Sequence, residues 1–154
     1  MDYESQLRLE RDAVVVSATL EASGGLLIHR VADPDGPAAL VDPPGVYWAV
    51  IQPAQLGTSP FVVRIHWTVY PDLPPSVLFA AEVGGLANVA AAWPAAAGYR
   101  APNDICKPFT AEGQALHPEW ASGAQAWRSE GNPFLYVIQN VQDDINRARG
   151  ARAS

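Results

Sequence analysis

Cysteine is almost absent from this 154-residue chain, because Cys106 is the only one. A single thiol cannot close an internal disulfide, which excludes a disulfide-stapled secreted protein and a four-cysteine zinc site. Lysine is equally scarce, with Lys107 alone, and the formal net charge is -6. Proteins that bind nucleic-acid phosphates or anionic membranes normally carry positive charge. We therefore expect no nucleic-acid partner and no membrane partner.

Long apolar runs are also missing. None reaches the roughly 18 residues that a membrane-spanning helix needs, and residues 1–12 are too charged for a signal peptide. Hydrophobic residues nevertheless make up 49% of the chain, which favours a folded protein over a disordered one. The length predicts a single domain over residues 1–154. The free cysteine fits a reducing compartment, so we expect a cytoplasmic location.

The hydrophobic pattern predicts a helix followed by strands. Residues 2–22 place Leu9, Ala13, Val16 and Leu20 on one helical face, although three consecutive valines at 14–16 favour a strand and would end the helix early. Four strands are then expected, at residues 26–31, 46–52, 61–69 and 77–83, with residues 32–45 as a loop.

The second half of the chain is less regular. Residues 84–98 are alanine-rich and fit a short helix or a loop, and residues 100–118 form an irregular segment that carries Cys106. A C-terminal helix is expected to begin at Asn132 and Pro133, an N-cap residue followed by proline at the first helical position. The order predicts an α+β fold: an N-terminal helix, a four-stranded antiparallel meander, the cysteine segment and a C-terminal helix.

Three blocks resemble the ubiquitin-conjugating (E2) enzyme family. Residues 47–53 (YWAVIQP) and 61–67 (FVVRIHW) look like two of its strands, and residues 70–79 (YPDLPPSVLF) are similar to its Tyr-Pro, Pro-Pro turn and following strand. The likeness extends over about residues 47–145. It implies the E2/UBC-like fold, with Cys106 at the catalytic position and Trp120 at that of a structural tryptophan.

The resemblance implies a transferase that needs no cofactor. Cys106 would accept a ubiquitin-like protein from an E1-like adenylating enzyme as a thioester and pass it to an amine of a protein target. The His-Pro-Asn motif of eukaryotic members is missing, and 14 residues separate Cys106 from Trp120. Both departures resemble the divergent bacterial branch, which implies a role in antiphage defence. The alternative is an inactive E2-like module that binds or scaffolds a ubiquitin-like protein.

Three residues near Cys106 are candidate catalytic groups, and each also has an ordinary explanation. Asn103 is a candidate oxyanion donor or a turn residue, with Asn88 as a rival donor. His117 could orient or deprotonate an incoming nucleophile, or it is a surface histidine. Asp104 could take a proton from an attacking amine, or it belongs to a turn.

Other chemistry at Cys106 is weaker on the sequence alone. Arg100 and Lys107 could supply the positive charge that favours a thiolate. A Cys–His hydrolase is disfavoured because the sequence suggests no third, orienting group. A metal site is disfavoured because the cysteine and the three histidines lack ligand spacing.

Partner contacts are expected at two places. Arg8 and Arg11 lie three residues apart and are predicted to share an exposed face of the first helix. The resemblance to the E2 family implies that this face contacts the E1-like enzyme, and the alternative is an ordinary solvated face. Trp127 is predicted to be an exposed partner contact. Trp48, Trp67 and Trp120 are more typical of a core.

Overall fold

The structure is a computed structural model that describes residues 1–31, 35 and 41–154, so the loop expected at 32–45 lies largely outside the described residues. Helix α1 (Tyr3–Ala22) opens the fold, with the Asp2 carboxylate accepting a hydrogen bond from the Ser5 N–H at 2.8 Å. The valine run does not end this helix early, because Val16 is buried on the same face as Leu20. Burial of that stripe outweighs the weaker helix propensity of valine.

The predicted four-stranded antiparallel meander is confirmed. Its strands follow one another in space in chain order. They are β1 (Leu26–Ile28), β2 (Val46–Ile51), β3 (Phe61–His66) and β4 (Ser76–Ala80). All four end earlier than expected, β2 by a single residue. Val69, for example, is exposed beyond the last paired residue of β3.

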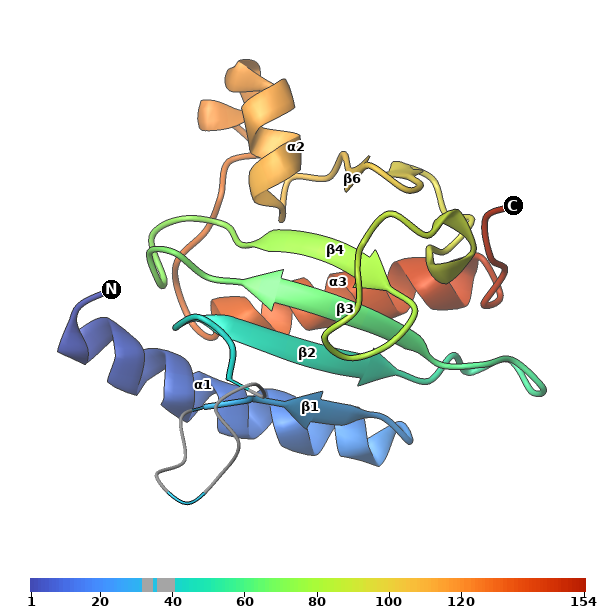
Figure 1. Cartoon of the computed structure of the whole chain (residues 1–154). Coiled ribbons are helices and arrows are strands. Elements are labelled where there is room, and N and C mark those ends of the chain that lie inside the picture. The colour runs from blue at the N-terminus through green and yellow to red at the C-terminus, as the bar shows by residue number, and fades with distance from the viewer. Residues whose placement is uncertain (32–34, 36–40) are drawn as a thin grey trace.

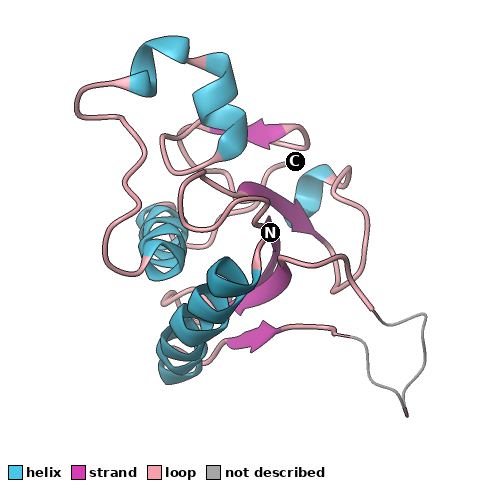
Figure 2. Ribbon diagram, turned by 90° about the vertical axis from the view of Figure 1, so that its left-hand side faces the viewer, coloured by secondary structure: helices cyan, strands magenta, loops and turns pink. Residues whose placement is uncertain are grey.

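Both long helices cover one face of this sheet. Helix α3 (Pro133–Arg147) begins as predicted: the Asn132 side chain accepts a hydrogen bond from the Leu135 N–H, and Pro133 is the first helical residue. Helices α1 and α3 lie behind the strands in Figure 1 and on the same side of the sheet in Figure 2, where they contact each other. Each fully buried apolar side chain in this layer stabilises the fold by about 1.5–3 kcal/mol.

The opposite face of the sheet carries a smaller cluster around Trp48, which packs with Val46 and Ala80. The Trp48 ring N–H donates to Asp42 at 3.1 Å, and both oxygens of that carboxylate accept from Arg30 at 2.8 Å. The Arg30 guanidinium also lies 5.7 Å from the centre of the Trp48 ring. The Arg30–Asp42 ion pair therefore lies against one end of the smaller cluster around Trp48.

The irregular segment expected at residues 100–118 contains short elements. They are β5 (Tyr99–Arg100), β6 (Asp104–Ile105) and α2 (Ala111–Leu116), preceded by the 3-10 helix η2 (Ala90–Ala92) and followed by η3 (Pro118–Ala121). The two-residue strands and the 3-10 helices of three and four residues are too short to show a hydrophobic period, and the six residues of α2 span less than two helical turns, so the sequence pattern missed them. None of the helices within the described residues is long and apolar enough to span a bilayer.

Candidate active site

A hairpin whose two strands have two residues each holds Cys106 at the edge of the core. Strands β5 and β6 pair Tyr99 with Ile105, and the Cys106 N–H extends the ladder with a 2.7 Å hydrogen bond to the Gly98 carbonyl. Tyr99 and Ile105 are buried, and the Tyr99 hydroxyl donates to Asp144 of α3 at 2.8 Å. Because neighbouring side chains in extended backbone alternate in direction, Cys106 turns away from the core and remains partly exposed.

Helix α2 is fixed to the same segment at its first turn. Thr110, fully buried, accepts a hydrogen bond from the Gly113 N–H at 2.9 Å and donates to the Ile105 carbonyl at 2.7 Å. The Ala111 N–H also donates to the Pro75 carbonyl at 2.8 Å, which ties the helix to the Pro-rich turn before β4. The end of α2 is therefore held in a defined place relative to Cys106.

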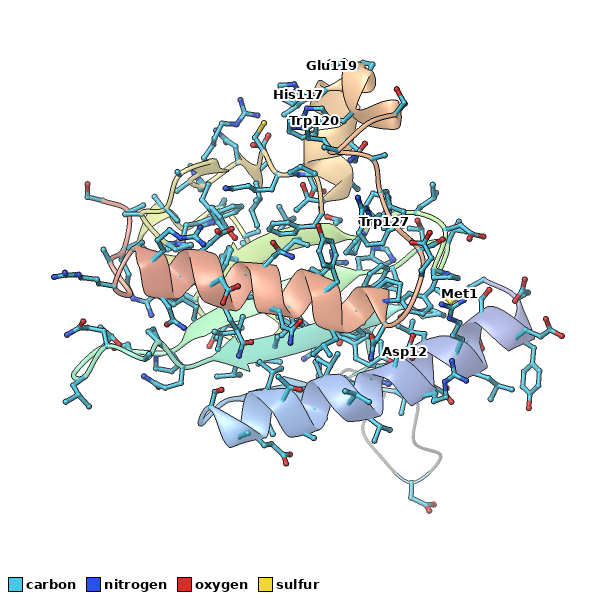
Figure 3. The ribbon with its side chains drawn as sticks, turned by 180° about the vertical axis from the view of Figure 1, so that it is seen from behind. Met1, Asp12, His117, Glu119, Trp120 and Trp127 are labelled. Carbon is cyan, nitrogen blue, oxygen red and sulfur yellow. The ribbon has the colours of Figure 1, made fainter. Side chains whose placement is uncertain are left out.

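The residue at that end is His117. Its Nε2 lies 3.1 Å from the Cys106 Sγ, and its Nδ1 lies 2.7 Å from the Glu119 carboxylate. The Trp120 ring stacks on the imidazole, with centroids 4.0 Å apart and planes 17° apart. Figure 3 shows His117, Glu119 and Trp120 together on the short helices that project from one end of the sheet.

The carboxylate fixes which imidazole nitrogen carries the proton. The hydrogen bond from His117 lowers the pKa of Glu119 below its ordinary value, so this carboxyl group is ionised at neutral pH. An ionised carboxylate only accepts hydrogen bonds, so Nδ1 is the protonated nitrogen of neutral His117. Nε2 then presents its lone pair to the thiol and can take its proton.

Asp104 is already engaged and is not the free base that the sequence allowed. Both of its carboxylate oxygens accept hydrogen bonds from Arg100 at 2.7 Å. The hydrogen bond and the charge of Asp104 raise the pKa of Arg100, with a smaller contribution from Cys106, which lies on the same side of the hairpin as Asp104. Arg100 therefore places positive charge near the thiol, as expected, although Asp104 balances it. The Lys107 Cε lies beside Gly98, whose carbonyl accepts the Cys106 N–H.

The oxyanion donor stays a prediction. Asn103 is exposed in the turn of the hairpin, where its N–H donates to the Arg100 carbonyl at 2.7 Å. Within the described residues, no hydrogen bond joins its side chain to Cys106. Asn88 is exposed in the loop after β4. The turn explanation accounts for what is seen of Asn103.

Two expectations about surfaces were wrong. Arg8 does not share an open face with Arg11, because it donates to the carbonyls of Ser129 and Gly131 and its side chain is only 35% exposed, against 75% for Arg11. Trp127 is not an exposed ring either. It is half-buried, and its N–H donates to the Pro71 carbonyl at 2.9 Å.

Trp120 and Glu119 carry roles that the sequence reasoning missed. Trp120 was expected in the core, but it is half-buried and covers His117, whereas Trp48 and Trp67 are buried as expected. Glu119 is the third group whose absence counted against Cys–His chemistry. The His-Pro-Glu spacing reveals it only once Pro118 is known to start helix η3, with His117 as the N-cap residue.

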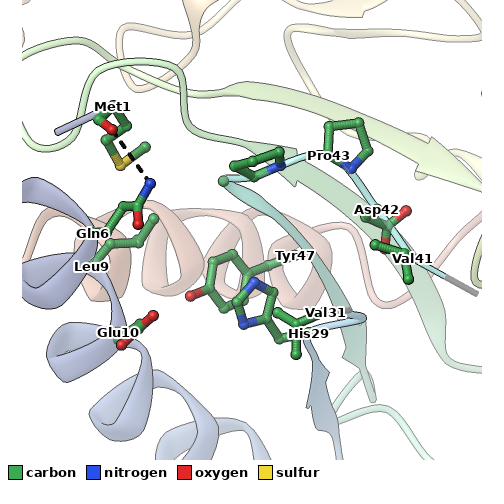
Figure 4. Close-up of a pocket in the computed structure, with 12 residues that line it drawn as sticks. Met1, Gln6, Leu9, Glu10, His29, Val31, Val41, Asp42, Pro43 and Tyr47 are labelled. Atoms are coloured by element: carbon green, nitrogen blue, oxygen red, sulfur yellow. Dashed lines mark hydrogen bonds between the residues drawn. The ribbon is translucent and has the colours of Figure 1, made fainter. Parts of the chain in front are cut away.

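A separate cavity of about 280 Å³ lies between the start of α1 and the ends of β1 and β2. The His29 ring stacks on Tyr47 at 4.0 Å in this cavity, and Leu9 and Glu10 line the α1 side, as Figure 4 shows. Its lining includes neither Cys106 nor His117. In the described part of the chain, no group of three metal-ligating side chains comes together.

Comparison with known proteins adds no family to this description. No protein-family model, curated protein or solved structure matches the chain. The candidate site therefore stands on its own geometry: a partly exposed thiol, an imidazole against it and a carboxylate behind the imidazole.

Proposed function

We propose that this protein is an E2-like conjugating enzyme that carries a ubiquitin-like protein as a thioester on Cys106. The observation that carries the proposal is the 3.1 Å contact between the Cys106 Sγ and the His117 Nε2 on a partly exposed segment. The order of elements supports it, because the Tyr-Pro turn precedes β4 and the cysteine follows that strand. A thiol is both a good nucleophile and a good leaving group, as a carrier of acyl groups must be.

Loading of the carrier is a thioester exchange. His117 takes the thiol proton on Nε2, and the Cys106 thiolate attacks the carbonyl carbon of the thioester between the carrier and the E1-like enzyme. The bond to the E1 sulfur breaks, and that sulfur leaves as a thiol with the proton from His117.

Transfer to the target forms an amide and releases the cysteine. An uncharged amine of a protein target attacks the carbonyl carbon of the Cys106 thioester, and the carbon–sulfur bond breaks. The thiolate leaves, the amine proton passes to the thiolate through His117, and the site returns to its starting state. The resemblance to bacterial E2-like proteins is the sole basis for placing this chemistry in antiphage defence.

The test is a charging reaction with ATP, a cognate ubiquitin-like protein and its E1-like enzyme, read on a non-reducing gel. We expect an adduct that thiol reductants cleave. Cys106→Ala should abolish it, and Cys106→Ser should give a reductant-resistant ester or no adduct. His117→Gln should slow formation of the adduct, because it removes the base that takes the thiol proton. His29→Gln is its matched control, because His29 lies in the separate cavity.

Two outcomes contradict the proposal. A reductant-sensitive adduct that persists in Cys106→Ala would place the acyl group on another residue. Tight binding of the ubiquitin-like protein without any adduct, using a competent E1-like enzyme, would favour the inactive binding module.

A further inference from the structure

The proposed function attaches an acyl group to the Cys106 sulfur, and the inference rests on that acylated form. A thioester sulfur has no proton to give, so His117 is no longer engaged as the base for the thiol. Its Nε2 lies 3.1 Å from the sulfur, and the reacting carbonyl carbon is one bond from that sulfur. An atom that attacks this carbon therefore comes within reach of the imidazole lone pair.

The imidazole is held in the form that acts as a base. The Glu119 carboxylate accepts from Nδ1 at 2.7 Å, and the Trp120 ring covers one face of the imidazole. Glu119 remains ionised because its pKa is lowered by the same hydrogen bond. By contrast, both oxygens of Asp104 are engaged by Arg100. His117 is thus the base presented to an acyl group on Cys106.

A base in this place matters more for oxygen nucleophiles than for amines. A lysine amine has a pKa near 10.4 in water, so a small neutral fraction exists at neutral pH and attacks without further activation. A hydroxyl group or a water molecule is weakly nucleophilic until an adjacent base removes its proton. General-base catalysis by a positioned histidine contributes about 10²–10⁴-fold to such steps.

We propose that the acylated site also transfers its acyl group to oxygen nucleophiles, with His117 as the general base and Glu119 as its positioning residue. The oxygen of a hydroxyl group or of water bonds to the thioester carbon while His117 takes its proton. The carbon–sulfur bond then breaks, and the Cys106 thiolate leaves and recovers the proton from the imidazolium. A hydroxyl acceptor gives an ester, and water gives a carboxylic acid.

The test needs neither a carrier protein nor an E1-like enzyme. A fluorescent Gly-Gly peptide thioester with an aromatic thiol leaving group acylates Cys106 by exchange, and excess donor is removed. The acyl-enzyme is then mixed with buffer, N-acetylserinamide or N-acetyllysinamide, and mass spectrometry separates acid, ester and amide. The proteins are the wild type, His117→Gln, Glu119→Gln and the exposed control Glu130→Gln, each checked for folding by circular dichroism.

We expect the wild type to form acid and ester. His117→Gln should slow both by about 100-fold, and Glu119→Gln should slow both by about 10-fold because it loses the charge that orients the imidazole. Amide formation at alkaline pH, where the amine is already neutral, should be slowed less than ester formation in His117→Gln, because the imidazole then serves only the release of the amine proton and not the activation of the nucleophile. Glu130→Gln should match the wild type.

The possible failures are distinguishable. If Cys106 is acylated but only amide forms, or if His117→Gln slows ester and amide formation equally, the inference is overturned and the proposed function stands. If no peptide thioester acylates Cys106 although its thiol still reacts with iodoacetamide, both the inference and the proposed function are overturned. Acid without ester would restrict the oxygen nucleophile to water.

Discussion

The Tyr70 hydroxyl donates a 2.5 Å hydrogen bond to the Asp12 carboxylate, although 58 residues separate them in the chain. Both residues are buried, and burial together with Asp12 raises the pKa of Tyr70 far above its ordinary value. The bond ties the Pro-rich turn before β4 to the middle of α1. The Pro75 carbonyl of the same turn accepts a hydrogen bond from the first residue of α2. The Tyr70–Asp12 bond is therefore connected through this turn to the helix that ends at His117.

Tyr70→Phe should reduce the free energy of unfolding by about 1–3 kcal/mol, because it leaves a buried carboxylate without its hydroxyl donor. Urea denaturation followed by tryptophan fluorescence measures the change. Tyr3→Phe is the control, since Tyr3 is 74% exposed. Equal stability of the two variants would contradict a stabilising role for the Tyr70–Asp12 bond.

Arg8 and Arg11 should differ in what they contribute. Arg8→Ala removes two hydrogen bonds to the Ser129 and Gly131 carbonyls and should cost about 1–2 kcal/mol. Arg11→Ala should cost less than about 0.5 kcal/mol, as for an exposed side chain. Thermal denaturation of both variants checks the difference, and a larger loss for Arg11→Ala would reverse the assignment.

The predicted contact with an E1-like enzyme should therefore be tested at Arg11 alone. Arg11→Glu reverses an exposed charge on α1 and loses only the 3.8 Å ion pair with Asp12, so it should slow charging of Cys106 and cost at most about 1 kcal/mol of stability. The measurement is the initial charging rate at low and high salt, because exposed charge contacts weaken as salt rises. An unchanged rate at low salt would remove α1 from the predicted interface.

Gly113 should be intolerant of any side chain. A Cβ at this buried position would lie 2.1 Å from the Lys107 carbonyl oxygen and 2.7 Å from the Lys107 nitrogen. Gly113→Ala should push α2 away from the cysteine segment, cost about 1–3 kcal/mol and slow acylation of Cys106. Ala115→Gly, an exposed change in the same helix, costs about 1 kcal/mol by propensity and should leave acylation intact.

Stability should decline as the pH falls below about 6.5. Desolvation lowers the pKa of His29, stacked on Tyr47, and desolvation followed by the charge of Arg64 lowers that of His66. Between those lowered values and the ordinary 6.5, the unfolded chain binds more protons than the folded one, so acid favours unfolding. Urea denaturation from about pH 5 to pH 7 measures this slope.

The double variant His29→Gln, His66→Gln tests the origin of that slope. It should flatten the pH dependence over this window, because glutamine does not titrate. The wild-type slope between about pH 8 and pH 9, where histidines are already neutral, is the baseline. A double variant with the full wild-type slope would assign it to other groups.

Helices α1 and α3 and strands β2, β3 and β4 were predictable because each is long enough to show its period. Strand β3 alternates buried Phe61, Val63 and Ile65 with half-exposed neighbours. The capping pair Asn132 and Pro133 marked the start of α3 correctly. Strand ends were less predictable, since exposed Val69 continues the pattern past the last hydrogen-bonded pair.

The candidate site was predictable in its residue types and not in its geometry. Cys106 and His117 were both candidates, but their contact depends on Thr110, which fixes the start of α2 against the cysteine segment. The hydrogen bonds from Arg100 to Asp104 depend on the register in which strands β5 and β6 pair. Such short elements are set by tertiary contacts, which local sequence does not encode.

The scarcity of lysine limits self-modification under the proposed function. Lys107 is the only lysine in the sequence, and its Cε lies beside Gly98, across the hairpin from Cys106. A thioester on Cys106 would therefore meet at most one lysine side chain of its own chain. Amide formation on the protein itself would be confined to this neighbour, and every other lysine acceptor would arrive from solution.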